Sequence, residues 1–215
     1  IFTPGKLIKN FFPPTEPIPR IYIDINFKGV RKFSQQMEKA HSIGKIIQGL
    51  DDWIPATLSY NEVTMKAKLR LKGDTLAHLN GKKSSMRINI KRGGGLFGVR
   101  RFSIQHPHTR NYESEILFYR ALQREGIMVP RYFFVNVTVN GEDIGIMAFQ
   151  EHMSKELLES QRRKEAPIIR FDDTALFNAY RTPLNETFKN LKLTPIKTIG
   201  SNPETKSDSF RTQLE

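Results

Sequence analysis

The sequence predicts an α+β domain in which a twisted antiparallel sheet carries one packed helix and follows a strand-helix-strand extension. Two observations support this fold class. Between residues 64 and 151, five short runs alternate apolar and polar side chains, which is the period of a half-buried strand. Between the third and fourth runs, the period lengthens to that of an amphipathic helix.

The first three strands are predicted from alternation and from the glycines that follow them. Residues 65–72 and 86–91 alternate without interruption, and residues 99–105 form the third run. The first run stops at Gly73 and the second runs into the glycines at 93–95. Glycine permits backbone angles that other residues resist, so we expect the strands to end at these positions.

The helix and the last two strands are expected between residues 111 and 150. A helix over 111–125 would place four large residues on one stripe, namely Tyr112, Ile116, Tyr119 and Leu122. Gly126 offers a C-cap for it. Residues 131–139 and 144–150 are rich in β-branched and aromatic residues and flank Asn140-Gly141, which predicts a hairpin.

The order strand-strand-strand-helix-strand-strand is that of a kinase-type nucleotide-binding lobe, so the sequence predicts a kinase-like N-terminal lobe. The extension before it is expected as a strand, a helix and a strand at residues 20–27, 30–48 and 54–60. Residues 1–19 contain five prolines and are expected to form an extended arm. We expect residues 20–180 to hold the lobe and the start of a second lobe, and 181–215 to be a polar linker.

The composition restricts the class of partner. Thirty-four Lys and Arg residues against 22 Asp and Glu give a formal charge of +12, which attracts nucleic acid, anionic lipid, nucleotide phosphates or an acidic protein. The absence of cysteine excludes disulfides, thiolate catalysis and cysteine-bound metals. No apolar run approaches the roughly 20 residues that span a bilayer. Since the chain begins with isoleucine, a signal peptide or membrane anchor would lie upstream of it.

A glycine-rich segment at residues 93–98 matches the pattern G-x-G-x-x-G. A dinucleotide-binding fingerprint requires a helix after the glycines, whereas a strand is predicted here, so we reject that interpretation. A kinase glycine loop lies between two strands, which leaves a phosphate role open beside that of a plain hairpin turn. The five histidines lack the spacing of a metal site, and we predict no metal ligands.

Basic residues concentrate in the first three predicted strands. Alternation places four of them on one face that could meet phosphate or substrate, namely Lys66, Lys68, Arg70 and Lys72. A kinase lobe uses a helical glutamate to hold a basic strand residue against the nucleotide phosphates. Glu113 and Glu115 are the candidates, and Glu115 lies next to the apolar stripe of the helix.

Several short motifs in one order resemble a known family. They are Leu69 to Asp74, Met86 to Ile88, Phe97-Gly98, Arg101 to Gln105, Thr109 to Asn111, Arg124 to Gly126, Arg131 to Gly141, Glu151-His152 and Pro167 to Phe171. Over most of residues 20–175 the chain is similar to the spore-coat-protein-H-like (CotH) kinases. The resemblance implies an atypical protein kinase that uses Mg²⁺ or Mn²⁺ to transfer the γ-phosphoryl group of ATP to Ser or Thr of envelope or spore-coat-like proteins. It also implies a location in the bacterial cell envelope or spore coat.

The resemblance assigns roles to individual residues. The family's helical glutamate falls on Glu115, Arg87 becomes a phosphate-side cation, and Glu151 begins the hinge. Asn89 stands where relatives often carry a lysine, so Arg87 or Arg100 would have to replace that cation, although a guanidinium is not equivalent to an ammonium. The expected nucleotide-binding residues are therefore Arg70, Lys72, Arg87, Arg100, Glu115 and Glu151.

The family's catalytic residues are expected C-terminal to Glu215, so we expect this chain alone to lack kinase activity. The alternative is a non-catalytic basic scaffold or assembly protein of the cell envelope that binds acidic partners through the Lys- and Arg-rich strands. RNA binding is a weaker alternative, because Tyr132 and Phe134 fit an apolar core better than a base-stacking surface. No specific nucleic acid is expected, and the acceptor protein is not predicted.

Overall fold

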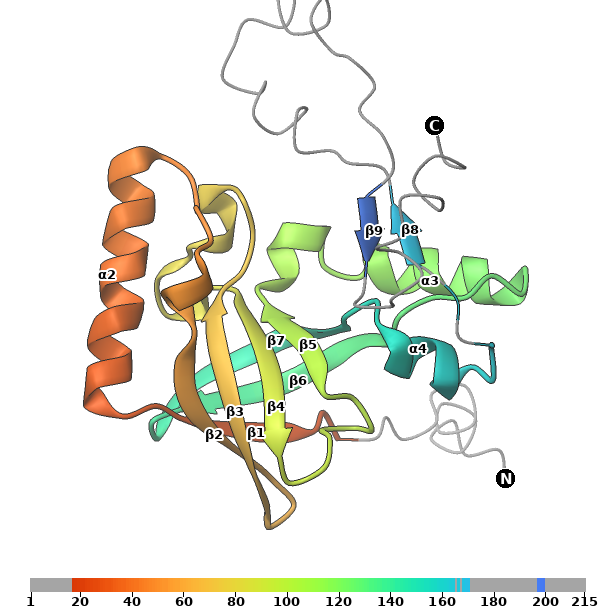
Figure 1. The fold of residues 1–215 in the computed structure, drawn as a ribbon, viewed down its shortest axis with the longest axis horizontal. Coiled ribbons are helices and arrows are strands. Elements are labelled where there is room, and N and C mark those ends of the chain that lie inside the picture. Colours follow the sequence, from red (N-terminus) through yellow and green to blue (C-terminus); the bar gives the residue numbers. More distant parts are fainter. Residues whose placement is uncertain (1–16, 165, 167, 171–196, 200–215) are drawn as a thin grey trace, which may run out of the picture.

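The computed structural model describes residues 17–164, 166, 168–170 and 197–199. Its centre is a closed barrel with the strand order β1-β2-β3-β4-β5-β7-β6 (Figure 1). The strands are β1 (Arg20–Asp24), β2 (Ile54–Tyr60), β3 (Val63–Leu71), β4 (Met86–Arg92), β5 (Arg101–Gln105), β6 (Tyr132–Val139) and β7 (Glu142–Glu151). Neighbouring strands are antiparallel, except that β1 runs parallel to β6 where the barrel closes.

Helices lie outside the barrel. They are α2 (Phe27–Ile43), α3 (Ser114–Arg124) and α4 (Lys155–Ser160), with short 3-10 turns η1 (Leu50–Asp52), η2 (Leu76–His78), η3 (Gly81–Lys83) and η4 (Pro107–Arg110). Helix α2 stands at one side next to β2, and α3 and α4 lie at the other side (Figure 1). Strands β8 (Ile168–Arg170) and β9 (Lys197–Ile199) form a separate two-stranded sheet. Within the described residues, no helix is long and apolar enough to cross a membrane.

The hydrophobic core fills the inside of the barrel, because alternate residues of each strand point inward. Fully buried side chains come from all seven strands, among them Ile21, Ile23, Leu58, Leu69, Ile88, Phe102, Val135 and Phe149. The rings of Phe102 and Phe149 stack with centroids 4.6 Å apart. Polar side chains of the same strands therefore point outward, and the outer surface is where charged groups can act.

Helix α2 begins and ends at residues with specific capping roles. The side chain of Asn26 accepts a hydrogen bond from the backbone N–H of Gly29, which is the bond an N-cap makes. The helix ends before Gly44, which adopts a left-handed conformation with φ 76°. The predicted helix over residues 30–48 was thus too long at its C-terminal end, because Gly44 is a C-cap and not an interior residue.

The prediction of a kinase-like lobe with one helix packed on an open sheet is wrong. The predicted extension is part of the barrel, since β1 pairs with both β2 and β6 and β2 pairs with β3. Helix α3 contributes no buried residue. Alternation shows which side of a strand faces the core, but it carries no information about pairing between segments far apart in the chain. The predicted arm and linker lie mostly outside the described residues.

Replacing Gly29 by alanine is expected to destabilise the barrel. Its Cβ would lie 2.6 Å from Cγ2 of Ile54 and 2.7 Å from Cγ2 of Ile25, which is too close for either contact. Overpacking of this kind costs about 1–3 kcal/mol. That exceeds the roughly 0.5–1 kcal/mol by which alanine usually improves a helix over glycine. Urea unfolding of Gly29→Ala should therefore show a lower midpoint.

Gly49→Ala is the matched control for this experiment. Gly49 has an ordinary extended backbone, and a Cβ there would lie 3.5 Å from its nearest neighbour, Asp52. We expect its unfolding midpoint to stay close to that of the unchanged protein. Equal midpoints for Gly29→Ala and Gly49→Ala would show that α2 does not pack closely against β2.

Candidate functional site

Lys72 follows β3 directly, and its ammonium group is buried outside the barrel core. Alternation turns Leu71 inward and Lys72 outward, yet Lys72 is only 8% exposed. Its Nζ donates hydrogen bonds to Oε1 of Gln105 at 2.5 Å and to Oε1 of Gln150 at 2.8 Å. Both acceptors are neutral amides, so these bonds hold the ammonium group in place without neutralising its charge.

The charged groups around Lys72 are mostly cations. The pKa of Lys72 is lowered from 10.5 to about 7, first by burial and then by the nearby cations Arg110 and Arg87, whereas Glu115 acts in the opposite direction. Arg87 belongs to β4, Arg110 ends η4, and Glu115 lies in the first turn of α3. We call these four residues the Lys72 cluster. With three cations and one carboxylate, the cluster has an excess of positive charge.

Two histidines border the Lys72 cluster and add hydrogen-bonding groups rather than charge. Burial lowers the pKa of His78 to about 4, and Lys72 and Arg110 contribute to the same direction. Burial also lowers the pKa of His152 to about 4, with contributions from Arg87, Arg101 and Lys72. Both rings are therefore neutral near pH 7. Nδ1 of His78 lies 3.0 Å from Oγ of Ser85.

The loop between β3 and β4 is held over Lys72 by backbone hydrogen bonds. The N–H of Lys72 donates to the carbonyl of Ser85 at 2.9 Å, and the N–H of Ser85 donates to the carbonyl of His78 at 2.8 Å. Gly73 permits the turn with φ 105°, and a Cβ at this position would lie 2.0 Å from Cδ2 of His78. The close packing of this loop fixes one side of the site.

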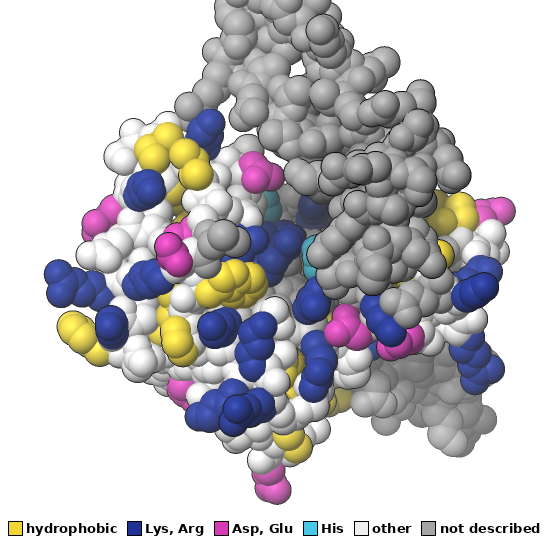
Figure 2. All heavy atoms as spheres, in the orientation of Figure 1, with side chains coloured by type: hydrophobic (Ala, Val, Ile, Leu, Met, Phe, Trp, Pro, Cys, Tyr) yellow, Lys and Arg dark blue, Asp and Glu magenta, His cyan; other side chains and the backbone are white. Residues whose placement is uncertain are grey.

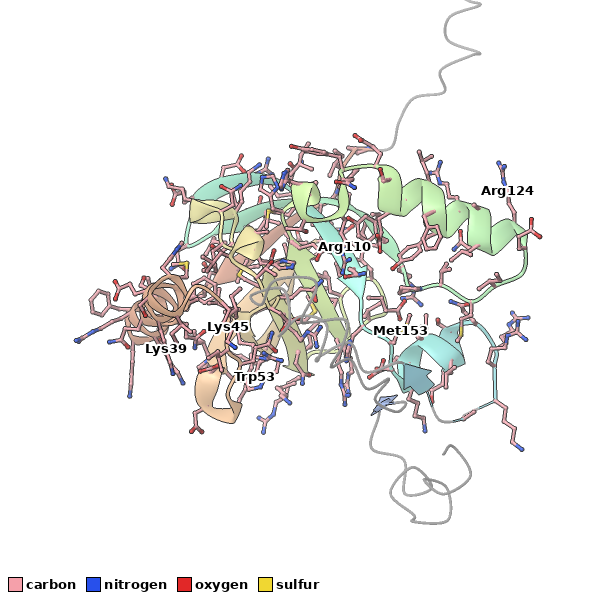
Figure 3. All side chains as sticks on the ribbon, turned by 90° about the horizontal axis from the view of Figure 1, so that it is seen from above. Lys39, Lys45, Trp53, Arg110, Arg124 and Met153 are labelled. Atoms are coloured by element: carbon pink, nitrogen blue, oxygen red, sulfur yellow. The ribbon has the colours of Figure 1, made fainter. Side chains whose placement is uncertain are left out.

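Helix α3 holds the carboxylate on the other side. Nε2 of Gln150 lies 3.3 Å from the hydroxyl of Tyr119. Burial and the hydrogen bond with Glu115 raise the pKa of Tyr119 to about 12. Gln150 therefore connects the ammonium group of Lys72 to Tyr119, which contacts Glu115. In Figure 3, Arg110 lies over the barrel near the start of α3, whereas Arg124 lies at the far end of this helix.

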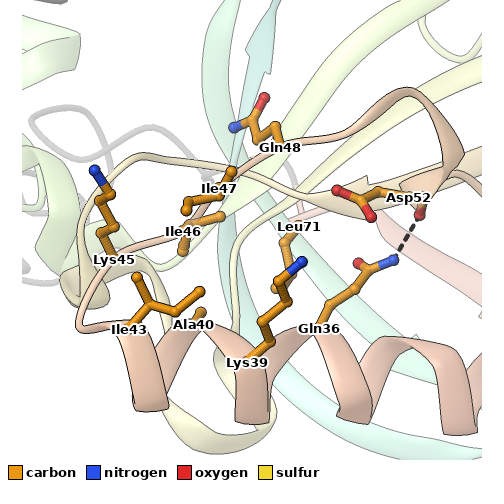
Figure 4. A pocket seen from close by; sticks show the side chains of 10 residues that line it. All are labelled: Gln36, Lys39, Ala40, Ile43, Lys45, Ile46, Ile47, Gln48, Asp52 and Leu71. Atoms are coloured by element: carbon orange, nitrogen blue, oxygen red, sulfur yellow. Dashed lines mark hydrogen bonds between the residues drawn. The ribbon is translucent and has the colours of Figure 1, made fainter.

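A small apolar cluster apart from the main core supports the end of β3 next to α2. Ala40 and Ile46 pack against Leu71, which precedes Lys72. These residues line a small pocket beside α2, where Nε2 of Gln36 donates to the carbonyl of Asp52 at 2.8 Å (Figure 4). Leu71 anchors the strand, so the position of Lys72 depends on the packing of α2.

Of the six predicted nucleotide-binding residues, the structure brings Lys72, Arg87 and Glu115 together. Arg70 lies beside them, donates a hydrogen bond to Oε1 of Gln48 and places its guanidinium 5.1 Å from the ring centroid of Trp53. Arg70 therefore already has two partners within the chain.

Arg100 lies at the opposite end of the barrel from Lys72. It precedes β5 and donates to the carbonyl of Gly94 at 3.3 Å, whereas Gln105 at the other end of β5 contacts Lys72. The glycine-rich segment at 93–98 is at that opposite end as well. The structure therefore does not bring this segment together with the Lys72 cluster.

Glu151 is the last residue of β7 and is buried, with 3% of its surface exposed. Its Oε2 accepts a hydrogen bond from the backbone N–H of Arg131 at 3.1 Å and lies 3.7 Å from Nε of the same residue. Burial raises the pKa of Glu151, and the bond and charge of Arg131 oppose this shift. Glu151 ties β7 to the start of β6 and is separate from the Lys72 cluster.

Sequence reasoning missed the two glutamines and Arg110 as members of the site. Gln105 and Gln150 stand at the ends of predicted strands, where a polar residue on an outward position carries no special signal. Arg110 is part of the motif Thr109 to Asn111 that resembles the CotH kinases, which is the one signal that could have found it.

A scan against protein-family models found no match to this chain, and a search of curated proteins found none.

The pKa of Lys72 is expected to respond to its two charged neighbours in opposite directions. Glu115→Gln removes the carboxylate that raises this pKa and should lower it further, whereas Arg110→Gln removes a cation and should raise it. NMR titration of chains with ¹³C-labelled lysine measures both shifts. Shifts of the same sign in the two variants would show that Glu115 and Arg110 do not both act on Lys72.

Burial of Lys72 also makes stability depend on pH. Between pH 7 and 10.5 the unfolded chain binds more protons at this residue than the folded chain does. The contribution of Lys72 to the free energy of unfolding therefore rises with pH in this window.

Proposed function

We propose that the Lys72 cluster binds the phosphates of ATP, and that this barrel is the nucleotide-binding part of a CotH-type protein kinase. The kinase transfers the γ-phosphoryl group to Ser or Thr of envelope or spore-coat-like proteins. One observation carries the proposal, namely a buried lysine held by neutral amides, with two arginines and a helical glutamate around it. It requires no kinase-like lobe, only a strand cation and a helical carboxylate placed on one surface.

The charge balance of the site favours an anionic ligand. A buried charge is costly unless it is paired, and Gln105 and Gln150 supply no counter-charge to Lys72. Phosphate oxygens would supply it. The pKa of Lys72 is near 7, and an anion bound beside it favours the ammonium form. Binding of the anion is therefore accompanied by uptake of a proton by Lys72.

The residue types suit phosphate in complementary ways. In protein kinases a strand lysine paired with a helical glutamate holds the nucleotide phosphates. Lys72 offers a compact ammonium, and Glu115 is the nearby carboxylate that favours its charged form. Arg87 and Arg110 add planar guanidinium groups that can bind phosphate through two hydrogen bonds. Asn89 stands where CotH kinases often carry a lysine, and in this proposal Lys72 supplies the ammonium group in its place.

The resemblance also implies Mg²⁺ or Mn²⁺. Among the residues that the structure describes, no three His, Asp or Glu side chains gather in a way that could hold a metal ion. The Lys72 cluster, with three cations and one carboxylate, does not fit a metal ion, and we assign it nucleotide binding alone.

ATP binding to this chain tests the proposal. Lys72→Met removes the ammonium group at nearly constant side-chain length and should weaken ATP binding at least tenfold, or about 1.4 kcal/mol. Lys39→Met is the matched control, because Lys39 is an exposed lysine on α2 that does not belong to the Lys72 cluster. It should leave the dissociation constant unchanged. Titration calorimetry measures both.

Two results would contradict nucleotide binding at Lys72. One is saturable ATP binding that Lys72→Met leaves unchanged, which would place the nucleotide elsewhere. The other is the absence of any saturable ATP binding to the unchanged chain, measured with thermal unfolding as proof that it is folded. The second result would favour the non-catalytic scaffold.

A further inference from the structure

A second basic surface lies on the exposed part of the same sheet. Strands β2, β3, β4 and β5 contain no Asp or Glu. Five exposed cations point outward from β3, β4 and β5, and we call them the basic face: Lys66, Lys68, Lys91, Arg92 and Arg101. Figure 2 shows Lys and Arg side chains gathered over the front of the barrel, where β3 and β4 lie in Figure 1.

A β-bulge concentrates charge within this face. Ala67 pairs with Ile90 and Lys66 pairs with Arg92, so Lys91 is an extra residue in β4. Two cations of β4 thus lie together opposite Lys66. Like charges directly across a strand pair are destabilising, which means that this arrangement costs stability in the free chain. A negatively charged partner would remove the cost.

The cations of the basic face are not neutralised by the rest of the described chain. None of them forms an ion pair with any residue that the structure describes. Nζ of Lys66, for example, donates a hydrogen bond to the neutral hydroxyl of Thr57. The face therefore carries five positive charges that remain available to a partner.

The geometry of the face fits an extended segment. Lys66 and Lys68 are two residues apart on one strand, which separates them by about 6.7 Å along it. An extended peptide repeats its side chains on one face at the same spacing. The closed barrel has no free strand edge, so a partner has to be recognised through side chains and not by strand addition.

Other polyanions fit this surface less well. Single-stranded nucleic acid binds sheets through exposed aromatic rings as well as cations, but the guanidinium of Arg70 already lies over the ring of Trp53. An anionic membrane is favoured by apolar side chains that enter it. In these four strands, Val63 is the one large apolar side chain that is exposed.

We propose that the basic face docks an extended, carboxylate-rich segment of a protein partner. This docking is independent of nucleotide binding, because the basic face and the Lys72 cluster share no residue. It places the partner on the surface next to the Lys72 cluster, since β3 continues from Lys66 and Lys68 to Lys72.

The test is fluorescence anisotropy with a short labelled peptide that alternates Glu and Ser. The doubly changed chain Lys66→Glu/Lys68→Glu should bind it at least roughly tenfold more weakly. Lys28→Glu/Lys39→Glu changes the net charge equally on the exposed side of α2 and should weaken binding less than roughly twofold. Circular dichroism checks that each chain is folded. Lys66→Gln/Lys68→Gln replaces the first variant if charge reversal unfolds it.

Several outcomes would overturn the docking proposal. Equal loss in the two charge-reversed chains would show a response to net charge only. Tighter binding of a phosphoserine peptide, single-stranded RNA or phosphatidylserine vesicles, dependent on Lys66 and Lys68, would assign the face to that ligand instead. Lys72→Met should bind the peptide as well as the unchanged chain does. Failure of peptide docking therefore does not contradict ATP binding at Lys72, and failure of ATP binding does not contradict peptide docking.

Discussion

The pairing of β1 with both β2 and β6 is the constraint on which the rest of the structure depends. The backbone N–H of Asn136 donates to the carbonyl of Pro19 at 2.9 Å, and the N–H of Ile25 donates to Oδ1 of Asn140 at 2.7 Å. These bonds join segments more than a hundred residues apart and leave no unpaired strand edge. They also bring Ile21 and Ile23 into the core, where both are fully buried.

Closure of the barrel decides where ligands can bind. The interior is filled by stacked aromatic and branched side chains, so charged groups are confined to the outer surface and the barrel ends. On that outer surface, Gln105, Gln150 and the loop between β3 and β4 contact Lys72, and Arg110 of η4 and Glu115 of α3 lie near it. The same strand remains exposed to solvent at Lys66 and Lys68. One sheet face thus carries a buried cationic site beside an open basic surface.

Two buried charged residues in this barrel differ in how their charges are balanced. Glu151 has Arg131 as a partner within the chain, and the pair joins β7 to β6. Within the described part of the chain, the ammonium group of Lys72 donates its hydrogen bonds to neutral amides. A buried charge with an opposite charge beside it is balanced within the fold, whereas one without such a partner favours a ligand that supplies the opposite charge. This contrast separates the structural residue from the candidate ligand-binding residue.

The sequence by itself determined the local elements. Strands β3, β4, β6 and β7 lie where alternation and turn residues predict them, because these signals act between neighbouring residues. Helix α3 is shorter than the predicted 111–125, since η4 and a left-handed conformation at Asn111 and Tyr112 precede it. Alternation also placed Lys66, Lys68, Arg70 and Lys72 on one face.

Only the tertiary structure decided which of those cations is buried. Gln105, Gln150 and Glu115 reach Lys72 from three other elements, and no local pattern reports that meeting. Arg100 is close to the other basic residues in sequence, but the antiparallel direction of β5 puts it at the far end of the barrel from Lys72. Closure through β1 and β6 likewise depends on contacts between distant segments, whose pairing is set by the combined packing of the core and not by the pattern of any single strand.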